Sequence, residues 1–141
     1  QKGNFSSLQL NDFISKLILQ IESTISQNNV SITLNIQPNN TSVNIDTAIP
    51  LGLIVNEILT NCFKHAFPNN RSGNIAVTLV KELNKTVLTI SDNGIGFNVE
   101  NTLQNKSLGL ELIEILSDQL SASLKTINDN GTKYILTLKT P

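Results

Sequence analysis

The chain has 141 residues, of which 39% are hydrophobic and 15% are charged, and its formal net charge is -1. This length and composition indicate one folded domain over residues 1–141 with a sizeable core, and they exclude a disordered chain. The near-neutral charge argues against a protein that covers nucleic acid or an anionic membrane with positive charge, so we expect this domain to contact neither.

Residue types that are rare or missing restrict the cellular compartment and the kind of chain further. Cys62 is the only cysteine, so no internal disulfide can form and nothing requires an oxidising compartment. The sequence starts at Gln1 and contains no methionine, which indicates a fragment of a longer protein. No apolar run approaches the roughly 20 residues that a membrane-spanning helix needs.

Hydrophobic spacing predicts a first helix over residues 8–27, capped by Asn11 or a neighbour. Alternating apolar and polar residues then predict a strand over 30–36. After a turn at 38–40, a second short strand is expected around Val43 and Ile45.

The strongest helix signal covers residues 47–66, with Pro50 in the first turn, where its missing N–H costs nothing. The apolar stripe along this helix consists of Leu51, Ile54, Val55, Ile58, Leu59, Cys62, Phe63 and Ala66. The later elements are expected in this order: strands 74–82 and 85–91, a loop at 92–97, a polar stretch at 98–106, a helix over 107–121, and strands 122–128 and 133–139 joined by a turn. Clustered strands with three helices and no continuous βαβ rhythm predict an α+β fold, a two-layer sandwich with three main helices on one face of a mixed, mostly antiparallel sheet.

Chemistry is concentrated first on the helix over 47–66. Glu57 and Asn61 stand four residues apart, with Lys64 and His65 about one turn further on. Oxygen ligands beside a cation are what magnesium and phosphate require. An ordinary solvated helix face accounts for the same residues, and from this helix alone it is the favoured interpretation.

A second candidate is the loop that follows the strand over 85–91. Asp92 can accept a hydrogen bond from an exocyclic amine, and Gly94 and Gly96 allow the backbone to approach a flat ligand. The same residues are common in turns. The loop lacks the third glycine of a dinucleotide-binding motif, and the chain has no P-loop.

Two further short segments complete the set. The segment Ser107-Leu108-Gly109-Leu110 opens a helix whose N-terminal amides favour an anion, although a plain serine cap explains it equally. Gly131-Thr132 lies in the last hairpin and is typical of a turn.

Taken together, the four segments in this order and spacing resemble the ATP-binding domain of sensor histidine kinases, in the GHKL superfamily. The stretch from Asp46 to Glu57 looks like the short-lid subgroup related to the HWE class. The resemblance covers residue 8 to the end. It implies a Bergerat-type ATP-binding fold, in which residues 97–106 form the lid.

The resemblance also implies roles for individual residues, with ATP and Mg²⁺ as cofactors. Asn61 is expected to ligate Mg²⁺ and Glu57 to orient or deprotonate the attacking group, while Lys64 neutralises phosphate and His65 ends the same motif. Asp92 is expected to accept the adenine amino group, with support from Thr132. The remaining expected nucleotide contacts are Gly94 and Gly96 at the base, and Leu108, Gly109 and Leu110 at the phosphates.

The implied activity is transfer of the ATP γ-phosphate to a histidine on an upstream dimerisation domain, with a response regulator downstream and a cytoplasmic location, which could be the cytoplasmic part of a membrane-bound sensor. His65 lies in the nucleotide helix, where the phosphoacceptor is not found, so this chain is not expected to phosphorylate itself. Three alternatives stay open: an anti-sigma-type serine kinase, an ATP hydrolase of the gyrase or heat-shock type, and a degenerate interaction module.

Overall fold

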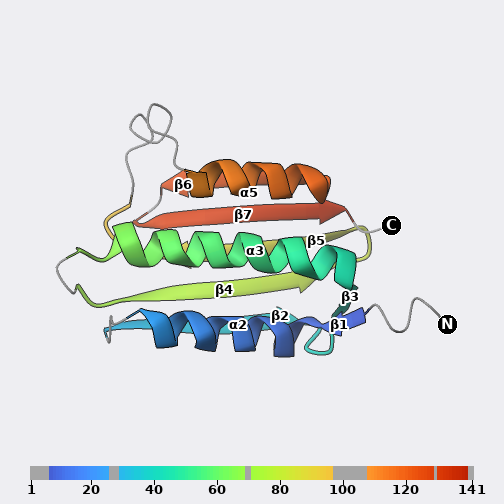
Figure 1. Ribbon diagram of the computed structural model, residues 1–141, viewed down its shortest axis with the longest axis horizontal. Coiled ribbons are helices and arrows are strands. Elements are labelled where there is room, and N and C mark those ends of the chain that lie inside the picture. The colour runs from blue at the N-terminus through green and yellow to red at the C-terminus, as the bar shows by residue number, and fades with distance from the viewer. Residues whose placement is uncertain (1–6, 26–28, 69–70, 97–107, 129, 140–141) are drawn as a thin grey trace.

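The computed structural model describes residues 7–25, 29–68, 71–96, 108–128 and 130–139. Within these ranges three helices cover one face of a five-stranded sheet (Figure 1). The helical elements are α2 (Leu10–Thr24), α3 (Ile45–Asn61), a π-helical turn η1 (Cys62–Ala66) and α5 (Leu108–Gln119). The strands are β1 (Ser7–Gln9), β2 (Val30–Gln37), β3 (Ser42–Asn44), β4 (Gly73–Lys81), β5 (Lys85–Asp92), β6 (Ala122–Asn128) and β7 (Thr132–Lys139).

The large sheet has the order β2-β4-β5-β7-β6. Strands β2 and β4 are parallel, and every other pair in this sheet is antiparallel. A separate two-stranded ribbon joins β1 to β3, with Ser7 opposite Asn44. This arrangement confirms the predicted α+β fold with a mixed, mostly antiparallel sheet.

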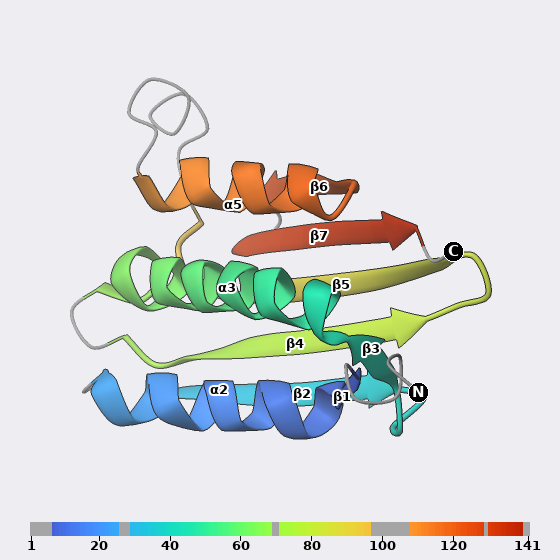
Figure 2. The same ribbon diagram turned by 45° about the vertical axis from the view of Figure 1, so that its right-hand side comes forward.

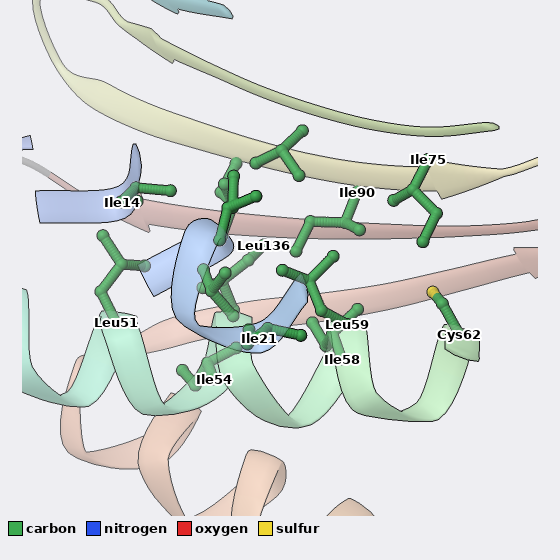
Figure 3. Packing of buried hydrophobic residues seen from close by; sticks show 14 of the residues in the cluster. Ile14, Ile21, Leu51, Ile54, Ile58, Leu59, Cys62, Ile75, Ile90 and Leu136 are labelled. Carbon is green, nitrogen blue, oxygen red and sulfur yellow. The ribbon is translucent and has the colours of Figure 1, made fainter. Parts of the chain in front are cut away.

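Helix α3 lies at the centre of the helical layer, between α2 and α5 (Figure 2). Its apolar stripe is buried because it faces the inner side of the sheet, which we define as the side that the helices cover. Figure 3 shows Leu51 and Leu59 of α3 pointing toward the strands that carry Ile90 and Leu136. All four side chains are at most 1% exposed, so the core is continuous from helix to sheet.

The N-terminus of α3 differs from its prediction. Ile45 begins the helix instead of belonging to a strand, because the Asn44 side chain caps it by accepting a hydrogen bond from the Asp46 N–H at 2.8 Å. Pro50 consequently lies in the second turn, where it cannot donate the helical hydrogen bond to the Asp46 carbonyl. The expectation that its missing N–H costs nothing was therefore wrong.

Other helix and strand boundaries also differ from their predictions. The helix predicted over 47–66 is α-helical only to Asn61 and continues as the π turn η1. Helix α2 starts at Leu10, so Asn11 is inside it and is not the cap; Gln9 occupies the cap position without a side-chain hydrogen bond. Strand β1 was not predicted. None of the helices in the described ranges is long and apolar enough to cross a membrane.

The cap of α3 can be tested by substitution. Asn44→Ala removes the acceptor for the Asp46 N–H, and we expect the free energy of unfolding to fall by about 1 kcal/mol in urea titrations. Asn40→Ala is the matched control, because Asn40 is exposed and its side chain forms no hydrogen bond within the described residues. Equal losses in both variants would contradict a capping role for Asn44.

Candidate functional site

The predicted site residues gather at one end of the sheet. Figures 1 and 2 both show the C-terminal end of α3, the end of β5, and the starts of β7 and α5 at this end. Antiparallel pairing explains the convergence, since β5 ends where β7 begins and Asp92 is the register partner of Thr132. Residues 97–107, which include the expected lid and Ser107, lie outside the described residues.

Glu57 and Asn61 occupy consecutive turns of α3 and are half-buried, whereas Lys64 and His65 in η1 are exposed. None of these four side chains has a hydrogen bond or an ion pair with another described residue. A π turn contains more residues than an α turn, so it rotates Lys64 and His65 away from the positions that α-helical spacing predicts. The Glu57–Asn61 pair itself keeps the expected i, i+4 geometry.

Asp92 is the last residue of β5 and is only 7% exposed on the inner face of the sheet. Its Oδ1 atom accepts two backbone hydrogen bonds, from the Gly94 N–H at 2.9 Å and from the Thr132 N–H at 3.2 Å. The predicted support from Thr132 is thus made by its backbone amide. Two donors from different segments fix the orientation of the carboxylate.

Two groups beside Asp92, the buried Cys62 and the half-buried Tyr134, were not predicted as site residues. Burial raises the pKa of the Cys62 thiol far above its usual value, and the charge of Asp92 and a hydrogen bond to its carboxylate raise it further. Burial also raises the pKa of the Tyr134 phenol, with smaller contributions from Cys62 and Asp92. Both groups therefore stay protonated at neutral pH.

The loop after β5 packs directly on the end of η1. The Ile95 N–H donates to the Ala66 carbonyl at 3.0 Å. A Cβ atom on Gly94 would lie 2.3 Å from the same carbonyl oxygen, so only glycine allows this approach. This contact joins the Asp92 loop to the helix that carries Glu57 and Asn61.

The last hairpin approaches the same loop from the other side. Gly131 has a φ of +130°, and a Cβ atom there would lie 2.0 Å from the Asp92 carbonyl oxygen. A side chain at this position would therefore push β7 away from Asp92. Gly96 is buried next to Asn128 of β6.

Asn93 holds the loop to the neighbouring strand. Its Oδ1 atom accepts the Asn74 N–H at 2.8 Å, and its carbonyl accepts a hydrogen bond from Arg71 Nη2 at 3.1 Å. Sequence reasoning missed Asn93, Asn74 and Arg71. The only available signal was the position of Asn93 between Asp92 and Gly94.

Helix α5 begins beside this loop with Leu108, Gly109 and Leu110. Gly109 and Leu110 are half-buried. The N-terminus of an α-helix presents backbone amides and a partial positive charge, both of which favour an anion. Phosphate binding at this point stays a prediction.

The donor set fits a metal that is shared with a ligand better than a metal held by protein alone. No group of three or more His, Cys, Asp or Glu side chains that could hold a metal ion occurs within the described ranges. The Glu57 carboxylate and the Asn61 amide, which have no partner among the described residues, suit Mg²⁺, because this ion keeps water and phosphate ligands and takes one or two protein oxygens.

A hollow of about 410 Å³ lies at the opposite end of the sheet, where Asn44, Thr47 and Leu138 contribute to its lining. It shares no residue with the Asp92 cluster. The chemistry that the sequence predicts is therefore at the other end of the domain, around Asp92, Asn61 and the start of α5.

Known proteins show the same domain. Residues 30–138 match the family model of the histidine kinase-like ATPase domain. The chain is 30% identical over 113 residues to Blue-light-activated histidine kinase 2 of Erythrobacter litoralis, covering 79% of this chain and 32% of that protein. It is 31% identical over 102 residues to the serine-protein kinase RsbW of Listeria monocytogenes, covering 62% of each.

Solved structures agree on the fold. The histidine kinase domain of the Erythrobacter litoralis EL346 blue-light activated kinase has a TM-score of 0.83, with 22% identity over 93% of this chain and 61% of that chain. The catalytic domain of histidine kinase ThkA has a TM-score of 0.79 and 17% sequence identity, and the match covers 94% of this chain and 93% of that chain. The chain spans only about a third of the length of the blue-light kinase. Because the family model covers more than half of the chain, this chain belongs to the histidine kinase-like ATPase domain family.

Proposed function

We propose that this domain binds ATP with Mg²⁺ at the Asp92 end of the sheet and transfers the γ-phosphate to a histidine on another domain of the same protein. The observation that carries the proposal is the buried Asp92 carboxylate, oriented by two backbone amides, beside a helix face whose Glu57 and Asn61 oxygens have no partner among the described residues. The similarity to a histidine kinase over 79% of the chain supports it.

Adenine selection follows from the chemistry of Asp92. A carboxylate only accepts hydrogen bonds, so it pairs with the exocyclic amine of adenine and repels the carbonyl oxygen that guanine has at the same position. Gly94 and Gly96 place backbone without side chains beside the base, and Thr132 keeps Asp92 in place.

The phosphates are assigned to the helix ends. Asn61 contributes its side-chain oxygen to Mg²⁺, which when bound supplies positive charge to the phosphate oxygens. Lys64 adds a mobile positive charge, and His65 borders the same turn. The amides around Leu108, Gly109 and Leu110 face the phosphates from α5.

Phosphoryl transfer depends on positioning and charge neutralisation more than on covalent chemistry by the protein. The acceptor imidazole nitrogen forms a bond to the γ-phosphorus, the bond to the bridging oxygen breaks, and ADP leaves. Glu57 orients the imidazole and takes its proton, because its carboxylate is half-buried and unpartnered within the described residues.

The acceptor must come from outside this chain. His65 is the only histidine, and it lies in the turn that is assigned to the nucleotide. We therefore propose an upstream dimerisation and phosphoacceptor domain as the direct partner, a response regulator as the next acceptor, and the cytoplasm as the location, where ATP is available.

A serine kinase of the anti-sigma type is the second candidate, and the similarity to RsbW favours it. The two candidates differ in the phosphorylated product. Radiolabelled ATP and the complete protein should give acid-labile, alkali-stable label, as expected for phosphohistidine, while this chain alone should stay unlabelled. Acid-stable label on a partner's serine would support the second candidate, and stable label on His65 would contradict the assignment of that residue.

Nucleotide selection can be tested with Asp92→Asn. The two backbone amides retain the oxygen of the new side chain, so its NH₂ group replaces an acceptor with a donor. We expect ADP affinity to fall about tenfold or more and the preference for ADP over GDP to shrink, as measured by calorimetry. Asp118→Asn, an exposed substitution on α5, should leave both affinities unchanged. An unaltered ADP preference in Asp92→Asn would contradict the assignment.

The assignment of Asn61 as a metal ligand predicts a change in how Mg²⁺ affects ATP affinity. Asn61→Ala should lose most of the gain in ATP affinity that Mg²⁺ provides, while ATP binding in EDTA stays as in the wild type, because only the metal ligand is removed. Asn56→Ala on the same helix serves as control. A full Mg²⁺ effect in Asn61→Ala would disprove that this amide is a ligand.

Glu57 should affect chemistry more than binding. In the complete kinase, Glu57→Gln is expected to slow phosphorylation of the acceptor histidine by roughly a hundredfold or more, with ATP affinity within about threefold of the wild type, since a general base is lost and the shape is kept. Single-turnover kinetics and equilibrium binding separate the two effects. Equal losses of phosphorylation rate and of ATP affinity would instead assign Glu57 to nucleotide binding.

A further inference from the structure

Cys62 stands at the junction between the helix of the site and the sheet. It is the first residue of η1, directly after Asn61, and is 3% exposed. Figure 3 shows its sulfur pointing from the helix toward the sheet, on the side where Ile75 lies. Ile75 is the register partner of Asp92 on β4, and the Asp92 side chain is buried on the same inner face. The thiol and the carboxylate therefore face each other across the helix–sheet interface.

The donors around the Asp92 carboxylate indicate where the thiol would contact it. Its Oδ1 atom accepts hydrogen bonds from two backbone amides, one in the loop after β5 and one at the start of β7. The Cys62 thiol faces the same carboxylate from the helix and can supply a third donor. A carboxylate has about four acceptor positions, so three protein donors leave roughly one for a ligand.

Resting on the proposed function, we propose that Cys62 is a positioning residue for adenine recognition. Its neutral thiol donates a hydrogen bond to the Asp92 carboxylate and holds it in the orientation that accepts the adenine amino group. Without this donor, the carboxylate keeps its contacts to Gly94 and Thr132 but gains freedom on the side that faces the helix. Adenine then binds a less ordered acceptor.

Tyr134 lies in the same cluster as Cys62 and Asp92, half-buried on the inner face of β7 two residues after Thr132. It is the only tyrosine in a chain without tryptophan, so its fluorescence reports on this cluster alone.

The test compares ADP with its analogue that lacks the 6-amino group, using this domain and calorimetry. Cys62→Ala should weaken ADP about three- to tenfold, the effect of one hydrogen bond, and leave the analogue unchanged. Cys62→Ser retains a donor and should restore ADP affinity to within about twofold of the wild type. The change in Tyr134 fluorescence on adding ADP should shrink in Cys62→Ala and return in Cys62→Ser.

A packing control separates positioning from stability. Ile58→Val removes a methyl group from α3 at a position 1% exposed, so it should lower the urea midpoint without changing ADP affinity. The proposal is overturned if Cys62→Ala leaves ADP affinity unchanged, weakens ADP and the analogue equally, or is not rescued by Cys62→Ser. If the wild type itself binds ADP and the analogue equally, adenine recognition by Asp92 fails together with the proposed function.

Discussion

A carboxylate buried at the end of a strand must be hydrogen-bonded, and in this domain that requirement determines how three segments meet. The Asp92 side chain is 7% exposed, and a carboxylate in such a position is costly unless donors surround it. The amides of Gly94 and Thr132 supply two of them from a loop and a strand, and the Cys62 thiol faces the carboxylate from the helical turn η1. The shape of this end of the sheet is therefore coupled to one functional group.

The loop that holds Asp92 also contacts the helix that carries the proposed metal ligand. The Ala66 carbonyl at the end of η1 accepts the Ile95 N–H, so the loop that positions Asp92 also fixes the end of the helix with Glu57 and Asn61. A π turn at this point adds one residue within the turn, which lets the helix end reach the loop while Lys64 and His65 stay exposed. The segments that carry the proposed base and metal ligands are thus joined by a direct backbone hydrogen bond.

Sequence reasoning identified most elements because apolar periodicity is strong where a helix or strand faces the core. It placed Ile45 in a strand because Val43 and Ile45 follow the alternating apolar pattern of a strand. The Asn44 cap, which starts a helix at Ile45, is not visible in that pattern. It missed β1, since three residues are too few for a period and pair with β3 far along the chain. Asp92 and Gly94 were singled out as candidates through turn chemistry and the order of motifs. The proximity of Cys62 and Tyr134 to Asp92 was not foreseen, because it arises from contacts between elements that are separate in sequence.

The β1–β3 ribbon connects the N-terminal part of the described chain to the start of α3. Strand β1 is paired to the residues immediately before α3, with Ser7 opposite the capping residue Asn44. Helix α3 has 17 residues, a rod of about 25 Å, and Glu57 and Asn61 lie near its far end. A displacement of β1 would therefore act on the N-terminal end of α3, at the opposite end of the helix from Glu57 and Asn61.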